Sequence, residues 1–228
     1  MQRRRRSRTK LKDRLLPDYT KGEEIFNMVS HIVGGAIGIA ALVLCIIVSA
    51  IHRNGYGLAG SIVYGISMIV LYTMSSVYHG LRAGTAKRVM QVLDHCTIYL
   101  LIAGTYTPIL LSAMRPIDPV SSWVLLGVVW GLSAIAITLT AIDLKKYSVF
   151  SMICYIGMGW CIVFKIPLLI AAVGWGGFWL ILLGGICYTI GAVLYGMGRT
   201  KKYMHSIFHL CVVAGSVLQL LAILLYAL

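Results

Sequence analysis

The last apolar stretch of the chain, residues 203–228, opens with two histidines, His205 and His209. They are four residues apart, so on a helix their side chains lie on one face and about one turn apart. Two imidazoles at this spacing can bind one metal ion together. Two more histidines, His79 and His95, lie at comparable depth in other hydrophobic segments. A complete metal site therefore needs a fold that brings at least one of these two to the first pair.

The composition of the chain is that of a membrane protein. Of its 228 residues, 59% are hydrophobic and only 12% are charged, whereas about 25% of the residues of a soluble domain are charged. Runs of more than about 18 apolar residues, the length that spans a membrane, recur along the sequence. The sequence therefore predicts an all-α, polytopic membrane protein built as one helical bundle.

Seven segments of the chain are each long enough to cross a hydrocarbon core of about 30 Å. Their approximate bounds are 26–51, 57–81, 90–112, 121–142, 148–170, 173–196 and 203–228. We therefore predict a seven-transmembrane-helix domain over residues 23–228. A basic N-terminal arm, residues 1–22, precedes it.

The distribution of positive charge predicts the orientation of this bundle. Seventeen of the 20 lysines and arginines fall on the side of the N-terminal arm, and the other three are Arg53, Arg115 and Lys165. By the positive-inside rule the N-terminus is cytoplasmic and the C-terminus lies outside. The arm is then expected to attract anionic lipids of the inner leaflet. Because topology accounts for the net charge of +13, we expect no role in nucleic-acid binding.

The alternation of the spans brings ionisable side chains from three helices to one level. His79 ends the second span, Asp94 begins the third, and His205 and His209 begin the seventh, all on the cytoplasmic side. An ionisable group at such depth costs about 2.5–3.5 kcal/mol and usually faces the bundle interior with a partner. Three imidazoles leave a tetrahedral zinc ion with one open position, as in catalytic sites. Asp94 would then act as a general base or orient a water molecule.

Other polar residues share faces with this group. Ser75 lies one turn before His79, and Glu24, Asn27 and His31 follow one another at spacings of three and four residues. Glu24 and His31 could instead brace the start of the first helix.

Two alternatives concern the histidines themselves. The ligand histidines could form a buried hydrogen-bonded cluster instead of a metal site, and imidazole also suits copper, iron or nickel. His95 and His52 are expected to be interfacial residues whose polar ends reach water.

The same residues carry a family resemblance. The combined pattern is Glu24-x2-Asn27-x3-His31, Ser75-x3-His79, Asp94 and His205-x3-His209. It resembles that of the progestin and adipoQ receptor family. The length of the chain, its residues 103–108 and its basic N-terminus resemble the bacterial branch of that family, the haemolysin III proteins.

This resemblance implies a seven-helix bundle with a cytoplasmic N-terminus. It also implies that His79, His205 and His209 hold a zinc ion, that Asp94 holds a water molecule on the zinc, and that Ser75 lies just behind the ligands. The family in turn resembles alkaline ceramidases, which implies metal-assisted hydrolysis of a lipid amide. In such a reaction Asp94 would accept a proton from water, and Ser75 would orient His79 or the water.

Three classes of function follow from the sequence and stay open. The leading hypothesis is a zinc-dependent hydrolase that acts on a lipid amide or otherwise changes the state of membrane lipids. A second is a non-catalytic membrane-homeostasis factor or sensor, in which zinc only ties helices together. A third is a cytolytic or channel-type protein, the class that the haemolysin name implies.

Overall fold

The computed structural model of the chain describes residues 9–198 and 201–228. Predictions that rest on the arginines of the first eight residues or on Arg199 lie outside the described residues.

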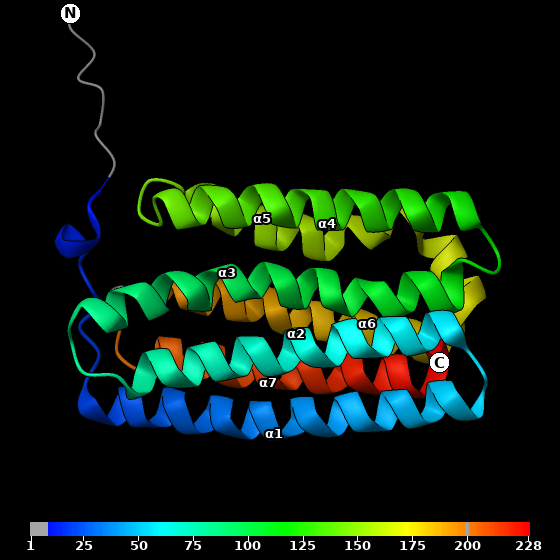
Figure 1. Ribbon diagram of the computed structural model, residues 1–228, viewed down its shortest axis with the longest axis horizontal. Helices are drawn as coiled ribbons and strands as arrows, with labels where there is room; N and C mark the ends of the chain where they lie inside the picture. The colour runs from blue at the N-terminus through cyan, green and yellow to red at the C-terminus, as the bar shows by residue number, and fades with distance from the viewer. Residues whose placement is uncertain (1–8, 199–200) are drawn as a thin grey trace, which may run out of the picture.

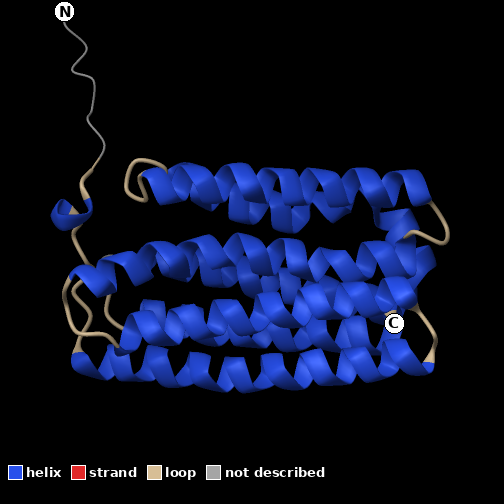
Figure 2. Ribbon diagram, in the orientation of Figure 1, coloured by secondary structure: helices blue, strands red, loops and turns tan. Residues whose placement is uncertain are grey.

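Long helices make up nearly all of the described chain, and no strand occurs in that part (Figure 2). The helices are α1 (Lys21–Ile51), α2 (Gly55–Gly80), α3 (Thr85–Pro108), α4 (Pro119–Ile142), α5 (Ser148–Trp160), α6 (Ile166–Met197) and α7 (Met204–Ala222). A π-helical segment continues α3 over Ile109–Met114, and another continues α7 over Ile223–Ala227. The prediction of an all-α chain is confirmed for the described residues.

The helices lie side by side with their long axes nearly parallel (Figure 1). Helix α1 packs against α2 and α7, α2 packs against α3, and α3 packs against α4. Helices α4 and α5 form the face opposite α1 in Figure 1. The central helix α3 is therefore enclosed on several sides, which explains why half of its residues are buried.

Six stretches of helix are long and apolar enough to span a membrane. The expected fifth and sixth spans, 148–170 and 173–196, fall in one stretch, Ser148–Met197. That stretch is not one straight helix, because Gly174 has φ 63° and ψ 177° and residues Cys161–Lys165 form a 3₁₀ turn. A positive φ suits glycine, which has no Cβ. The structure thus supports six candidate spans, and the count of seven is not established.

Helix α1 begins at a capping box. The Thr20 hydroxyl accepts a hydrogen bond from the backbone N–H of Glu23, and the backbone N–H of Thr20 donates to the Glu23 carboxylate. The buried residues of α1 then recur every three or four positions, Asn27 and His31 among them. At Gly34 a Cβ atom would lie 2.5 Å from the Tyr72 ring, so this glycine allows α1 and α2 to approach closely.

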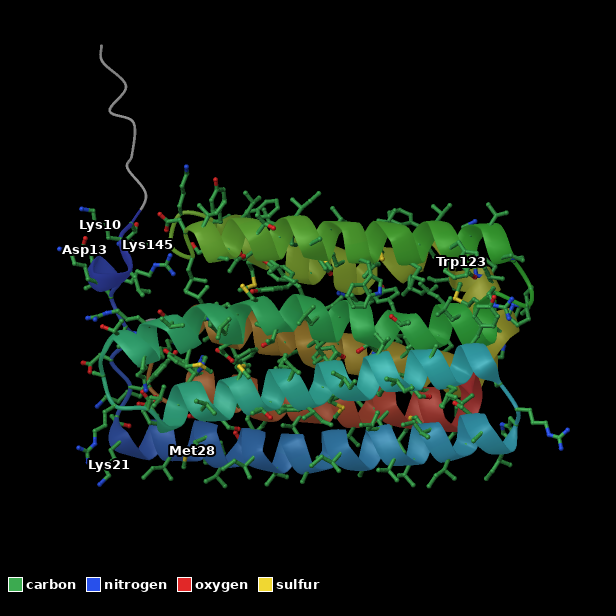
Figure 3. All side chains as sticks on the ribbon, in the orientation of Figure 1. Lys10, Asp13, Lys21, Met28, Trp123 and Lys145 are labelled. Carbon is green, nitrogen blue, oxygen red and sulfur yellow. The ribbon has the colours of Figure 1, made fainter. Side chains whose placement is uncertain are left out.

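The described part of the arm, Thr9–Thr20, crosses one end of the bundle and is called the strap below. The backbone N–H of Thr9 donates to the Asp143 carboxylate at 2.8 Å, and Arg14 donates to the carbonyl of Ile142 at 3.3 Å. Burial of the Asp143 carboxyl opposes its ionisation, but hydrogen bonds from the backbone amides of Thr9 and Lys146 outweigh this effect and lower its pKa. Figure 3 shows Lys10 of the strap and Lys145 at the same end of the bundle.

Candidate metal centre

Three buried histidines meet where α2 ends and α7 begins. His79 lies in the last turn of α2, and His205 and His209 lie in the first two turns of α7. Each offers one ring nitrogen, and these three atoms lie within 4.8 Å of one another. The exposed fractions of the three residues are 3%, 6% and 1%. The group could hold a metal ion.

A carboxylate fixes the ring of His79. Its Nδ1 lies 2.7 Å from Oε2 of Glu24, so Nδ1 donates and Nε2 is left as the basic nitrogen. The Nζ atom of Lys87 donates to the other oxygen of Glu24, also at 2.7 Å. Among the described residues Nε2 of His79 has no hydrogen-bond partner. Carboxylates commonly orient metal-binding histidines in this way.

The two histidines of α7 point the same type of nitrogen at each other. Their Nε2 atoms are 3.1 Å apart. Either one Nε2 atom carries a hydrogen and donates a hydrogen bond to the other, or both Nε2 atoms direct their lone pairs at a shared cation. Because Nε2 of His79 is also unpartnered in the described chain, the three donors fit a cation with a preference for imidazole.

Helix α1 completes the wall of this centre. The ring of His31 stacks on that of His209, with centroids 3.7 Å apart, and meets Tyr72 edge-on at 4.9 Å. Both ring nitrogens of His31 and both amide atoms of Asn27 lack hydrogen-bond partners within the described residues. The two neighbouring glutamates of α1 differ in their contacts: Glu23 caps the helix, whereas Glu24 contacts His79.

Asp94 and Ser75 line a cavity that also reaches His205 and His209. Because α3 begins at Thr85, Asp94 lies in its third turn rather than at its start. Its carboxylate is 3.7 Å from Nδ1 of His95. In the described chain neither Asp94 nor Ser75 makes a hydrogen bond to the three histidines.

The side chain of His95 is largely enclosed by other residues rather than extended toward water. Its Nδ1 donates to the carbonyl of Gln91 at 2.8 Å, so its Nε2 accepts from the Tyr195 hydroxyl at 2.9 Å. The side chain lines the cavity. The backbone carbonyl of Gln91 and the Tyr195 hydroxyl supply the polar partners that the interface would otherwise provide.

Two residues of the site escape the sequence reasoning. Tyr19 of the strap stacks on the ring of His205, with centroids 4.7 Å apart and planes 18° apart. Burial raises the pKa of the Tyr19 phenol well above its ordinary value, and Tyr195 and Asp94 act in the same direction, so the phenol stays neutral. Lys87, which the sequence analysis counts only among the seventeen basic residues on the side of the N-terminal arm, is buried against Glu24. The sequence contains a signal for this pair, because Lys87 and Glu24 are both predicted to lie at the cytoplasmic ends of their spans.

The cavity has a volume of about 900 Å³. It follows α7 from His205 to Gln219, which is about 21 Å along a helix. Hydrophobic side chains such as Ile102, Leu169 and Phe178 form much of its wall, and the strap borders it at the histidine end. The cavity is elongated and mostly apolar, and it is polar at one end. This shape and chemistry suit a lipid chain.

Known proteins resemble this chain over most of its length. The family described as "Haemolysin-III related" matches residues 19–220. The chain is 36% identical over 206 residues to "Hemolysin-3" of Bacillus cereus, which covers 90% of this chain and 92% of that protein. It is 33% identical over 208 residues to "Hemolysin-3 homolog" of Bacillus subtilis (strain 168), which covers 91% of this chain and 96% of that protein.

The matched region contains all three histidines and the six candidate spans except the last few residues. A match of this extent, over helices of this length, identifies the chain as a multi-pass protein of the cell membrane and a member of the haemolysin III family.

Proposed function

We propose that the protein is a zinc-dependent hydrolase that cleaves an amide bond in a membrane lipid. The observation that carries the proposal is the group of three buried histidines, two of which, His205 and His209, line one end of a cavity of about 900 Å³. A metal centre and an apolar, elongated cavity together suit a substrate with one polar linkage and a long chain.

The donor set supports zinc as the metal. Three imidazoles leave a tetrahedral ion one open position, the pattern of catalytic zinc sites. His79, His205 and His209 would bind it, and Glu24 would hold the ring of His79 in the required tautomer. When bound, zinc supplies Lewis acidity, which polarises a carbonyl and makes water acidic enough to attack it.

Asp94 and Ser75 would perform the remaining steps. As water attacks the carbonyl carbon, the Asp94 carboxylate accepts its proton. A carbon–oxygen bond forms and the carbon–nitrogen bond breaks, and Asp94 returns the proton to the leaving nitrogen. The immediate products are a carboxylic acid and an amine, and the proton of the acid then passes to the amine, which gives a carboxylate and an ammonium group. Ser75, which lines the same cavity, would orient the water or His79.

The same proposal includes an orientation in the membrane. We place the strap and the histidines on the cytoplasmic side, with seven spans over residues 23–228 and the C-terminus outside. The support is the excess of lysine and arginine at the strap end. The arm, residues 1–22, would then attract anionic lipid, and the metal centre would lie within the inner leaflet, at the level of a lipid's polar linkage.

The test is turnover by an Asp94→Asn variant in detergent with a lipid amide as substrate. We expect about one zinc ion per chain in both proteins and a loss of turnover of at least 100-fold in the variant. Asp13→Asn is the matched control, because Asp13 is an exposed carboxylate of the strap. Equal turnover by wild type and Asp94→Asn would contradict the proposed chemistry.

A structural role for zinc is the second candidate. It is favoured by the origin of the ligands, since a shared ion would tie α2 to α7. In that case Asp94→Asn would leave every functional readout unchanged, whereas loss of a ligand would lower stability.

The printed names of the relatives suggest a third candidate, cytolysis. A lytic protein would release dye from vesicles of pure lipid, so the absence of release would count against it.

A further inference from the structure

The cavity contains a second polar position far from the histidines. Gln219 lies on α7 ten residues after His209, which is about 15 Å along the helix. Its side chain lines the cavity, and only 6% of the residue is exposed. A glutamine at this depth in a membrane is unusual, because a polar side chain there needs a partner.

The amide of Gln219 is oriented by the neighbouring helix. Its nitrogen donates to the backbone carbonyl of Ile181 on α6 at 3.0 Å. Only the N–H end of an amide can satisfy a carbonyl, so the oxygen Oε1 must be at the other end. Within the described residues this oxygen has no hydrogen-bond partner. Gln219 therefore offers one fixed, buried acceptor.

The packing around Gln219 makes room for the amide. A Cβ atom at Gly184 would lie 2.7 Å from the amide nitrogen of Gln219. Any larger residue at this position of α6 would thus displace the amide from the carbonyl of Ile181. The local structure accommodates a polar group where an apolar one would pack more simply.

Nearby polar groups show that the unpartnered oxygen is not a general property of this depth. Ser216 lies one turn before Gln219, and its hydroxyl is hydrogen-bonded to those of Tyr72 at 2.8 Å and Tyr188 at 2.9 Å. These hydroxyls have partners within the protein, whereas the acceptor of Gln219 has none among the described residues. An acceptor left unmatched in this way favours a donor that arrives with a ligand.

We propose that Oε1 of Gln219 is a second polar subsite, which accepts a hydrogen bond from a hydroxyl group on the chain of a bound lipid. This inference rests on the proposed function, because it takes the cavity as the site of a lipid chain. It adds a substrate class: lipid amides whose acyl chain carries a hydroxyl group about 15 Å from the polar linkage. Unsubstituted chains would bind without satisfying the acceptor.

The test is binding of fatty acids to the full-length, zinc-loaded protein in detergent. The probes are one saturated fatty acid and a series of the same acid with a single hydroxyl group at successive positions. We expect the wild type to bind the best-placed hydroxy acid about fivefold more tightly than the plain acid. The preference should peak in the distal half of the chain.

Two variants assign the preference to one residue. Gln219→Met keeps the length of the side chain but removes the acceptor, so it should bind the plain and the hydroxylated acids equally. Gln91→Met is the matched control, because Gln91 also lines the cavity but lies near the histidine end. It should keep the full preference. Helical content and zinc content are measured for each variant.

Each other outcome has a definite meaning. Equal affinity of the wild type for all the acids, or no binding of any of them, would overturn the subsite. If Gln219→Met does not fold, the dependence of wild-type affinity on hydroxyl position decides the question alone. Lipid-amide turnover is measured separately: a hydroxyl preference without turnover would support the subsite and contradict only the hydrolase function.

Discussion

Helix α7 contributes residues to two buried polar clusters that differ in one respect. The histidine cluster is His79, His205 and His209, and the serine cluster is Ser216 with Tyr64, Tyr72 and Tyr188. Ser216 and His209 are each only 1% exposed. The hydroxyls of the serine cluster are hydrogen-bonded within the protein, whereas ring nitrogens of all three histidines are unpartnered in the described chain or face each other. Burial of polar groups is common to both clusters, so only the missing partners distinguish a candidate site from a structural contact.

The chemistry of the side chains explains the difference. A hydroxyl rotates and both donates and accepts, so a few hydroxyls can satisfy one another. A neutral imidazole has one donor and one acceptor in fixed directions. With Nδ1 of His79 committed to Glu24, Nε2 of His79 is an acceptor that no described donor satisfies, and the Nε2 atoms of His205 and His209 face each other. A cation would complete the histidine cluster, while the serine cluster needs nothing further.

The largest expected effect is the loss of a metal ligand. We expect wild type to contain about one zinc ion per chain and His209→Ala to contain almost none. A ligand that binds only the folded state stabilises it by about 4 kcal/mol at a thousandfold excess over its dissociation constant. A chelator should therefore lower the melting temperature of wild type and leave that of His209→Ala unchanged.

The control for this prediction is His52→Ala. His52 lies at the C-terminal end of α1, where its Nδ1 contacts the carbonyl of Leu228. The variant should keep the zinc and its response to the chelator. If carefully prepared wild-type protein contains no metal, the histidine cluster is a structural cluster like the serine cluster. The proposed difference between the two clusters would then be wrong.

The next effect concerns the carboxylate behind the centre. Glu24→Gln removes the charge that fixes His79 and deprives Lys87 of its anionic partner, while the carbonyl of Leu81 and the ring of Tyr78 still contact the ammonium group. Loss of such a supporting carboxylate costs about 10–100-fold in metal affinity. Competition with a metal-sensitive dye measures this change. Glu23→Gln is the matched control: it weakens the helix cap but should leave metal affinity within about twofold.

The serine cluster should respond in stability alone. Ser216→Ala removes the partner of the Tyr72 and Tyr188 hydroxyls. Loss of such a hydrogen bond costs about 1 kcal/mol, which corresponds to a decrease of about 2–4 °C in melting temperature for a chain of this size. Zinc content should not change. Thr138→Val, at an exposed position of α4, serves as the reference. A loss of zinc from Ser216→Ala would show that the two clusters are coupled.

Much of the histidine cluster could be predicted because it depends on the alternation of long helices. Spans that reverse direction bring the end of α2 and the start of α7 to one level, whatever their detailed packing. The buried face of α1 with Asn27 and His31 follows from helical periodicity in the same way.

The remaining features depend on local contacts that periodicity does not encode. Tyr19 reaches His205 from an irregular segment. Gln219 resembles any isolated polar residue in an apolar run until the carbonyl of Ile181 and the space at Gly184 are known. The span count differs because the expected break near 170–173 is a single non-helical glycine, Gly174, within Ser148–Met197.

The smallest expected effect concerns the strap, which contacts the histidine cluster through Tyr19. Asp143→Asn replaces a charged acceptor of the Thr9 amide with a neutral one, and the loss should be below about 1 kcal/mol. Hydrogen exchange of the strap should therefore be a few times faster in the variant, whereas exchange around Ser216 should be the same in both proteins.

The difference between wild type and Asp143→Asn should also depend on pH. The pKa of the Asp143 carboxyl is lowered in the folded protein, because the amide hydrogen bonds outweigh the opposing effect of burial. Its contribution to strap docking is therefore complete above the ordinary aspartate pKa of about 4 and is lost as the pH falls through the lower folded value. Comparing the two proteins at each pH cancels the intrinsic pH dependence of exchange. A difference that persists unchanged under strongly acidic conditions would show that the charge of Asp143 is not what holds the strap.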